Sequence, residues 1–506
     1  MKKELATKFN LKDLKVNNLD ILKQIMSFYP NKQLYKIKSA KSKQEIISVY
    51  PSNTKCKVYK HEEWHSDDYE ITTQEIDFTV SFFKQFQDLL YKTPVVALLS
   101  NLQQNSEYCH DVEGMKNCYY CFDGLESQDS YYCYRIHYCK SCVDCYSIYH
   151  SELLYECVNL ENSYNSKYSY HCKQVSDSHF LINCRNIQNS FMCSNLRNKK
   201  YCIYNKQYTK EEYEQFILKI DFCDYKQILY LKKYFYEKLL LETFFPPAFV
   251  ENCENVSGNY LKNSFSVENV FESWDMKDAY NCFQCSKGKD VMHSFMCCEK
   301  VEKCFQCVAV GIESYETINC AFVWHSSFME YCYMCLNCNY CFGCIGLRNK
   351  KYCILNKQYS KKEYFEKKEQ LINKMKKEQT YGLFFPISIS PFHYEDTIAY
   401  DLFDAKYKNI FNEEFKKYSK NYIQKTDSIC TCQITKKDFL ITQQEKNFYN
   451  KNNIPFPRIS FQMRHKNRME LMSTNFYEKS YQSINSFFKN FHKRKIVSKQ
   501  LYEKIF

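Results

Sequence analysis

Residues 196–209 read LRNKKYCIYNKQYT, and residues 347–360 read LRNKKYCILNKQYS. Each copy stands at the end of a run of cysteines, and the second starts 151 residues (347 − 196) after the first. A stretch of this length that returns almost unchanged indicates that a larger unit has been duplicated. The sequence therefore predicts two Cys-rich modules, each closed by this signature.

The cysteines gather in two blocks that precede or include the signatures. Of the 30 cysteines, eleven lie from Cys118 to Cys202 and thirteen from Cys282 to Cys353. A short template returns in both blocks: a polar residue, then Cys or Ser, then an aromatic residue or His, as in NCYYC at 117 and NCFQC at 281. Its intervals of 10 to 18 residues are too short for separate domains and are typical of stacked supersecondary units.

These units look extended, because they are short, rich in Tyr, Phe, Val and Ile, and without a 3.6-residue period. Asn and Asp can take the left-handed corner positions that Gly would otherwise fill. Residues i and i+3 of a straight strand face opposite sides, so both sulfurs of a CxxC pair point inward only if the chain turns between them. The predicted fold is α+β, mainly β: two tandem Cys-rich β-solenoid-like arrays, each closed by a capping helix, with small mixed N- and C-terminal domains.

Each signature is followed by a helical pattern that ends in FFP, at 244–246 and at 384–386. We interpret the signature as the last coil of an array and the helix as its cap. Arg197, Lys199 and Lys200 could hold an anion there, although solvated charge is the simpler interpretation. The predicted segments are a mixed α/β domain at 1–108, array 1 at 109–216, a helical connector at 217–280, array 2 at 281–366, a helical cap and linker at 367–420, and a domain with a basic helical tail at 421–506.

Composition predicts a globular cytoplasmic protein. Hydrophobic residues make up 45% of the 506 positions, with only 8 Gly and 9 Pro. No run approaches the roughly 18 apolar residues of a membrane span, and the opening MKKELATKFN lacks the apolar core of a signal peptide. In a reducing cytosol the cysteines are free core thiols or metal ligands rather than disulfides.

Several long motifs resemble a known family. They are KCKVYKHEEWHSDD at 55, DFTVSFFKQF at 77, both signatures, FFPISISPF at 384 and IPFPRISFQMRHKNRM at 454. Together they resemble an uncharacterised bacterial family of Cys-rich repeat proteins with zinc-ribbon-like ends, some of whose members are labelled CaiB/BaiF. That label implies a coenzyme A transferase, but the sequence shows no parallel α/β pattern of the length that such a fold needs.

The resemblance implies a zinc ribbon at each end of the chain, and the sequence departs from that pattern. Ser460 and Met463 stand where the C-terminal CxxC is expected, directly before Arg464, and Ser39 stands at an expected N-terminal ligand. Only Cys430 and Cys432 remain near the C-terminal site, whereas a ribbon needs four N or S ligands. We therefore expect degenerate ribbons that have lost their metal.

Zinc is the leading chemical hypothesis for the arrays, because CxxC pairs have the spacing of zinc knuckles. The candidate ligands are Cys118, Cys121, Cys139, Cys142, Cys145, Cys282, Cys285, Cys304, Cys307, Cys332, Cys335, Cys338, Cys341 and Cys344. The equal alternative is that reduced cysteines form an apolar core, since Ser130, Ser163 and Ser190 take the same template position. An iron–sulfur cluster is a third interpretation, weakened because CYMCLNCNYCFGC at 332 lacks the fourth-ligand spacing and the following Pro of ferredoxins.

The basic tail suggests a second class of function. Residues 461–506 carry ten Lys or Arg against three Glu, a balance of about +7, together with several Phe and Tyr. RNA or DNA could bind to Arg464, Lys466, Arg468, Lys493, Arg494 and Lys495. No P-loop, GxGxxG, GxSxG or HExxH motif is present, so no catalytic residue is assigned. The sequence thus predicts a non-enzymatic scaffold, zinc-binding or metal-free, with an unknown protein partner or a nucleic acid.

Overall fold

The computed structural model describes residues 18–66, 68–246, 249–254, 258–262, 270–273, 296–297, 308–310, 315–318, 323–404, 410–418, 426, 428–472 and 495–496. The described chain is α+β and consists mostly of strands, which confirms the predicted class. No sheet within these ranges closes into a barrel. None of the helices seen in them is both long enough and apolar enough to cross a membrane.

The chain forms two compact units, and each combines segments that are distant in sequence. Unit 1 contains Met1–Leu98, Ala248–Ala405 and Phe476–Ser483, and unit 2 contains Leu99–Pro247, Lys406–Asn475 and Ile484–Phe506. The six consecutive segments expected from the sequence remain a prediction.

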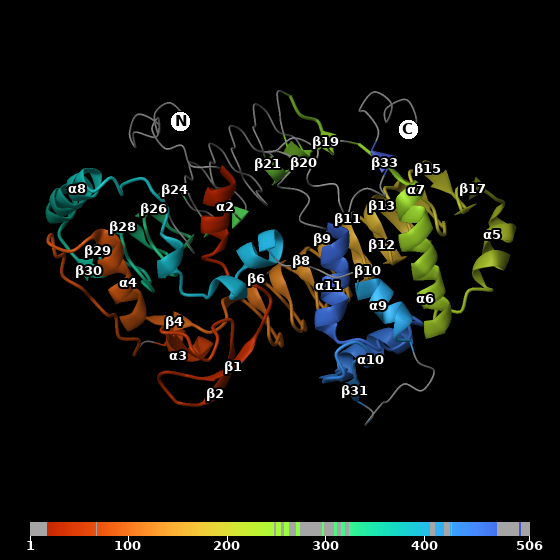
Figure 1. The fold of residues 1–506 in the computed structure, drawn as a ribbon, viewed down its shortest axis with the longest axis horizontal. Helices are drawn as coiled ribbons and strands as arrows, with labels where there is room; N and C mark the ends of the chain where they lie inside the picture. Colours follow the sequence, from red (N-terminus) through yellow and green to blue (C-terminus); the bar gives the residue numbers. More distant parts are fainter. Residues whose placement is uncertain are drawn as a thin grey trace. The chain divides into compact units, whose positions relative to one another are not determined.

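An eleven-stranded sheet, here called ladder 1, dominates unit 2 (Figure 1). Its strands are β5 (Ser100–Asn101), β6 (His110–Glu113), β7 (Phe122–Leu125), β8 (Tyr134–His137), β9 (Tyr146–Tyr149), β10 (Glu152–Tyr155), β11 (Val158–Glu161), β12 (Tyr164–Lys167), β13 (Tyr170–His179), β14 (Arg185–Gln188) and β15 (Arg197–Lys200). All of the pairs are parallel, and the register advances by twelve residues at every step, as in Tyr134↔Tyr146 and Arg185↔Arg197. We call each twelve-residue step a rung, and residues that recur at this interval a column.

The backbone of ladder 1 turns at every third residue. From Leu102 to Tyr204 each third position has a positive φ, between 45° and 65°, and only Gly114 among them is a glycine. The residue after most of these turns points inward, and Cys118 and Cys121, on either side of the turn at Tyr120, are both buried. In the last rung Lys199, which pairs with the buried Ile187, is exposed. The predicted turn within a CxxC pair is therefore confirmed. No Val, Ile or Thr occupies a turn position, as expected because β-branched residues tolerate positive φ least.

The first signature ends ladder 1 with a reversal of direction. The strands β16 (Cys202–Ile203) and β17 (Lys206–Gln207) pair antiparallel across Tyr204 and Asn205, whose φ values are 49° and 64°. Two successive positive φ values are typical of a type I′ hairpin turn. Thr209 and Glu212 then form a reciprocal capping box, which starts α5 (Lys210–Ile217) because it satisfies free N–H groups at the helix start.

The helices after Thr209 are shorter than the sequence pattern predicts. Instead of one helix to FFP, α5 is followed by α6 (Tyr225–Tyr234), a π-helical turn (Phe235–Leu239), α7 (Leu240–Glu242) and β18 (Phe244–Phe245). The interruption contains Asp221 and Asp224, whose carboxylates accept hydrogen bonds from the backbone N–H groups of Cys223 and Lys226. Such local acceptors compete with continuous helix, and Asp224 becomes the cap of α6.

The remaining described elements of unit 2 come from the C-terminal part of the chain. They are α9 (Ile410–Lys416), β31 (Ile429–Thr431), β32 (Asp438–Leu440), α10 (Gln443–Lys451), α11 (Phe461–Met472) and β33 (Lys495–Ile496). Helix α11 contacts β11, and its Phe461 ring packs on Tyr120 and Tyr132 of ladder 1. The predicted strand at FLIT is represented by β32.

Unit 1 begins with mixed structure. Its N-terminal elements are α2 (Asn18–Met26), β1 (Tyr35–Lys38), β2 (Glu45–Ser48), β3 (Lys57–Tyr59), α3 (His61–His65), α4 (Phe82–Lys92) and β4 (Pro94–Val96). The sequence of this segment predicts a helix near 11–27, a strand at EIISVYP from 45 and a helix at FFKQFQDLLYK from 82. The strand and the second helix are present as β2 and α4. Residues 11–17 lie outside the described ranges.

Short parallel strands and a second signature complete unit 1. The strands are β19 (Val250–Glu251), β20 (Gly258–Lys262), β21 (Val270–Ser273), β22 (Met296–Cys297), β23 (Ala309–Val310), β24 (Tyr315–Ile318), β25 (Val323–Trp324), β26 (Ser327–Glu330), β27 (Cys335–Leu336), β28 (Asn339–Phe342), β29 (Lys351–Ile354) and β30 (Lys357–Gln358). Strands β24, β26, β28 and β29 form ladder 2, again with a twelve-residue register. The signature repeats the hairpin, at Leu355 and Asn356, and the capping box, at Ser360 and Glu363, before α8 (Lys361–Lys377).

Candidate functional site

The predicted ligands of array 1 form the interior of ladder 1. Cys121, Cys133, Cys145 and Cys157 belong to one column and are at most 1% exposed. Cys118, Ser130 and Cys142 belong to another, so cysteine and serine do alternate at one structural position. These side chains pack with Val112, Ile136, Ile148, Leu154 and Leu160 as one hydrophobic cluster. The described cysteines of this ladder are core residues.

Hydrogen bonds to the backbone fix the thiols in the ladder. The Sγ of Cys121 donates to the carbonyl oxygen of Tyr119 at 3.6 Å or to that of Ser130 at 3.3 Å. Serine likewise donates to the carbonyl oxygen two residues earlier, since Ser130 Oγ donates to Gln128 O at 2.9 Å. Burial raises the pKa of the Cys157 thiol and of the Cys193 thiol, because a thiolate loses its hydration inside the ladder. These two thiols therefore stay protonated at neutral pH. At Cys133 burial alone would raise the pKa, but hydrogen bonds with Cys121 and Cys145 outweigh it and lower that pKa to about 6.

Backbone carbonyl oxygens and other thiols surround the predicted zinc ligands. Within the described ranges, no three side chains of His, Cys, Asp or Glu gather in a way that could hold a metal ion. The two cysteines of each CxxC pair lie on opposite sides of a turn in the same rung, and their protons face carbonyl oxygens. Cys139, Cys142 and Cys145 follow this pattern, as do Cys332, Cys335, Cys338, Cys341 and Cys344 of unit 1. Cys282, Cys285, Cys304 and Cys307 lie outside the described residues, so zinc at those positions remains a prediction.

Two turns with matching hydrogen bonds occur at the predicted ribbon ends. Ser39 N–H donates to Gln44 O, and Cys432 N–H donates to Lys437 O, both at 2.8 Å. In each turn the next residue extends the pattern: Ala40 N–H donates to Val58 O, and Gln433 N–H donates to Arg458 O. A helix, α3 or α11, begins three residues after that acceptor. The two ends thus share one local structure.

The side chains at these turns differ from a metal-binding set. Ser39 Oγ donates to the Glu63 carboxylate at 2.5 Å, so a hydrogen bond joins the N-terminal turn to α3. At the C-terminal turn, burial alone would raise the pKa of Cys432, but hydrogen bonds from Thr435 and from the Ser460 backbone outweigh it and lower that pKa. Two buried cysteines, Cys430 and Cys432, with Thr435 and Ser460 beside Cys432, do not supply four zinc ligands.

Arg464 and Arg468, predicted to contact nucleic acid, lie in the interior of unit 2. Arg464 Nε is 2.7 Å from one Asp144 oxygen, and Arg468 Nη1 donates to the other at 3.0 Å. Both arginines are less than 5% exposed. Lys466, on the same helix, is exposed. Lys493 and Arg494 are outside the described ranges, and Lys495 belongs to β33.

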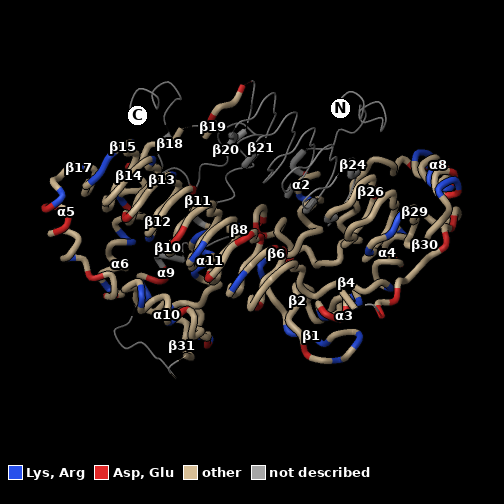
Figure 2. Tube along the Cα trace, turned by 180° about the vertical axis from the view of Figure 1, so that it is seen from behind, with Lys and Arg blue, Asp and Glu red and all other residues tan. Residues whose placement is uncertain are grey.

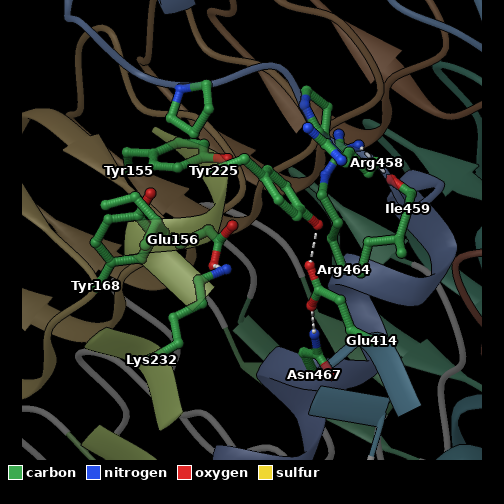
Figure 3. A pocket seen from close by; sticks show the side chains of 13 residues that line it. Tyr155, Glu156, Tyr168, Tyr225, Lys232, Glu414, Arg458, Ile459, Arg464 and Asn467 are labelled. Carbon is green, nitrogen blue, oxygen red and sulfur yellow. Dashed lines mark hydrogen bonds and ion pairs between the residues drawn. The ribbon is translucent and has the colours of Figure 1, made fainter. Parts of the chain in front are cut away.

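A second buried charge cluster surrounds a cavity of about 20 Å³ in unit 2 (Figure 3). Lys232 of α6 is 2.5 Å from Glu156. Glu414 of α9 accepts hydrogen bonds from Tyr225 and, at 3.4 Å, from Asn467. Burial raises the pKa of the Glu414 carboxyl, and Lys232 opposes that shift. The space is sufficient for one water molecule but not for a substrate, so we assign these pairs to holding α6, α9 and α11 against ladder 1.

The sequence analysis missed this cluster and Asp144, although one signal was present. Tyr108, Tyr120, Tyr132 and Tyr168 occupy a single column of turn positions, which is interrupted by Asp144 and Glu156. A carboxylate in an otherwise aromatic column requires a cation in a covering element. Without the twelve-residue interval, the interruption is not visible.

The candidate histidines do not form catalytic pairs. His110 Nδ1 accepts the Leu99 N–H at 3.1 Å, and burial lowers the pKa of His110 to about 3. The neighbouring Cys109 thiol donates to the Glu107 carbonyl. The His61 and His65 rings lie 4.4 Å apart, and burial, together with His61, lowers the pKa of His65 to about 4. These rings are neutral packing residues.

The sequence was also compared with known proteins. No family model and no curated protein matches the chain.

Proposed function

We propose that the protein is a non-enzymatic scaffold built from two tandem β-solenoid arrays, in which the cysteines are core thiols and not metal ligands. The observation that carries this proposal is the hydrogen bonding of the thiols. Each predicted array ligand in ladder 1 donates its proton to a carbonyl oxygen two residues earlier, as the serines of the same columns do. A zinc ligand must be a thiolate, whereas each of these Sγ atoms donates a hydrogen bond to a backbone oxygen.

The twelve-residue register supports the solenoid part of the proposal. Inward residues recur four times per rung and form columns of Cys, Ser, Val, Ile and Leu, so that each rung buries its apolar side against the next. The outward residues also repeat at this fixed spacing along the ladder. A regular outer surface on a rigid core is suited to binding an extended partner.

Metal and thiol analysis tests the proposal. Protein purified under reducing conditions should contain less than one zinc or iron per chain by elemental analysis. Treatment with a chelator should leave its circular dichroism and its unfolding midpoint unchanged. One or more metal ions per chain, together with thiols that a chelator releases, would instead establish the zinc interpretation. Replacing Cys332 and Cys344 by Ser would then show whether the described cysteines hold the metal.

A further inference from the structure

The last rungs of ladder 1 carry an excess of positive charge. Residues 173–206 contain Lys173, Arg185, Arg197, Lys199, Lys200 and Lys206, against a single carboxylate, Asp177. Arg185, Lys199, Lys200 and Lys206 are exposed. In Figure 2 the tube is blue along β15. The cationic end of ladder 1, meaning residues 173–206, is therefore a surface feature of unit 2.

The register places like charges beside one another. Arg185 pairs with Arg197 on the last two parallel strands, whereas Lys173, opposite Arg185 on its other side, forms an ion pair with Glu161 at 3.3 Å. Neighbouring strands lie about 4.8 Å apart, and like charges directly opposite each other in a sheet repel. A ligand whose negative charges recur along its length would offset the charge of Arg185 and Arg197 together. A phosphate backbone is such a ligand, and arginine forks match phosphate oxygens.

Exposed tyrosines flank these cations. Tyr164 is 46% exposed and shares a column with Lys200, through the pairs Tyr164↔Ser176, Ser176↔Gln188 and Gln188↔Lys200. Tyr208 is 37% exposed, and its N–H donates to the carbonyl of Tyr201, whose ring lies beneath the Lys200 ammonium. Phosphate-binding cations combined with accessible rings are typical of proteins that bind single strands, because unpaired bases stack on such rings.

The opposite end of the same ladder lacks this combination. Lys116 and Lys140 belong to the column of Lys200 and are also exposed. Glu152 lies opposite Lys140 at 4.0 Å, and the exposed Glu126 lies between the two lysines in the chain. The charges at this end are therefore mixed, and the two ends provide a matched comparison.

We propose that the cationic end of ladder 1, with Tyr164 and Tyr208, binds the phosphate backbone of a single-stranded nucleic acid. The proposal rests on the scaffold function, for which it names the class of partner. In this proposal the nucleic acid binds to the exposed Arg185, Lys199 and Lys200 of β14 and β15 and not to the tail arginines. Two of those, Arg464 and Arg468, are buried in ion pairs with Asp144.

Binding of a labelled oligouridylate, followed by fluorescence anisotropy over a range of salt concentrations, tests the proposal. For the intact protein, log affinity should fall linearly with log salt because counterions are released. The double variant Lys199→Gln with Lys200→Gln should lower the magnitude of this slope by about 1.4, since each phosphate contact to a single strand contributes about 0.7. The variant Lys116→Gln with Lys140→Gln removes the same charge from the same ladder and should leave the slope unchanged.

Four outcomes would overturn the proposal. The first three are no salt-dependent binding at all, equal losses in the two double variants, and a loss confined to a variant with Lys493, Arg494 and Lys495 all changed to Gln. Equal binding of heparin and oligouridylate that is insensitive to Tyr164→Ala would also overturn it, because a charged polymer without bases would then suffice. Circular dichroism verifies that the variants fold. Metal and thiol counts are independent of these measurements, so a failure of nucleic-acid binding leaves the scaffold proposal standing.

Discussion

At the scale of single residues, Asp144 shows how the chain uses charge inside unit 2. Its carboxylate is fully buried, and it meets Arg464 and Arg468, the second of them 324 residues further along the chain. Arg464 also approaches Glu445, whose carboxylate accepts the Tyr132 hydroxyl. Each charge of this network has an opposite partner, which offsets the cost of removing it from water.

Replacing Asp144 by Asn keeps the shape and removes the charge. The buried guanidinium groups of Arg464 and Arg468 would then both lose their ion pair with residue 144. Removal of one partner from a buried ion pair lowers the free energy of unfolding by about 3–5 kcal/mol. Urea unfolding should show a loss of that size. The control is Glu152→Gln, because Glu152 and Lys140 are both over 40% exposed at 4.0 Å and such pairs contribute about 1 kcal/mol or less. Equal small effects of the two changes would contradict the structural role of the network.

Acid stability should depend on His110. Burial holds the pKa of His110 at about 3, below the value of about 6.5 in an unfolded chain. Between these two values the unfolded state binds the extra proton, so the free energy of unfolding falls as pH decreases from about 6.5 to 3. The full effect of one such proton is about 1.4 kcal/mol per pH unit.

The His110→Asn variant tests this linkage, because the amide oxygen can accept the Leu99 N–H without titrating. Unfolding free energies measured between pH 4 and 7 should depend less steeply on pH in this variant. Replacement of the exposed His150 by Asn serves as the control and should not alter the slope. A slope that is unchanged by His110→Asn would show that His110 already titrates in the folded state as it does in the unfolded one.

At the scale of elements, the signature works as a terminator for each ladder. Asn205 Oδ1 accepts the Ser194 N–H, and Asn356 Oδ1 accepts the Ile345 N–H, both at 2.8 Å. The two asparagines also donate their own N–H groups to Cys193 and Cys344. Since the chain reverses at this residue, the amide oxygen supplies an acceptor that the next rung would have provided.

Asn356→Ala should destabilise unit 1 by about 3 kcal/mol, because alanine pays for left-handed backbone and leaves a buried N–H without an acceptor. Asn356→Gly separates the two causes, since glycine removes only the hydrogen bond and should recover about 1–2 kcal/mol. Asn205 is exposed, so Asn205→Ala should cost less than Asn356→Ala. Chemical denaturation of the three variants measures these differences. A glycine variant no more stable than the alanine variant would exclude a contribution from the turn.

Local features of these elements could be predicted from sequence, and distant partners could not. The signature, its capping helix and the turn inside each CxxC pair follow from short-range patterns, as Thr209 and Glu212 illustrate. The twelve-residue register was missed because its columns mix Cys, Ser, Leu and Asn, so that the template seemed to return at uneven intervals. The buried role of Arg464 was missed for another reason. A helix rich in basic residues is predicted to be exposed, and the sequence does not show that Asp144, which is distant along the chain, forms an ion pair with Arg464.

At the scale of the whole molecule, the described thiols divide into two groups. Those of the ladders are buried, whereas Cys223, between α5 and α6, is exposed and Cys253 is half-buried. Brief alkylation of the native protein followed by peptide mass spectrometry should therefore label Cys223 before Cys121, Cys145 or Cys157. Unfolding in urea should make all four equally reactive. Early labelling of the ladder cysteines would mean that the rungs open readily, and Cys223→Ser is the control for the assigned peptide.

Because turns and inward residues alternate at fixed intervals, the length of each ladder segment determines which side chains occupy turns and which face inward. An insertion of one or two residues would place inward side chains at turns and would bring Val or Ile to positions with positive φ. An insertion of three would restore the turns but move every later side chain to the next face, so that Asp144 would no longer meet Arg464. Only an insertion or deletion of twelve residues, or of a multiple of twelve, preserves both the turn positions and the columns. Such a protein can lengthen or shorten during evolution by whole rungs, and relatives of different length should differ in these segments by multiples of twelve.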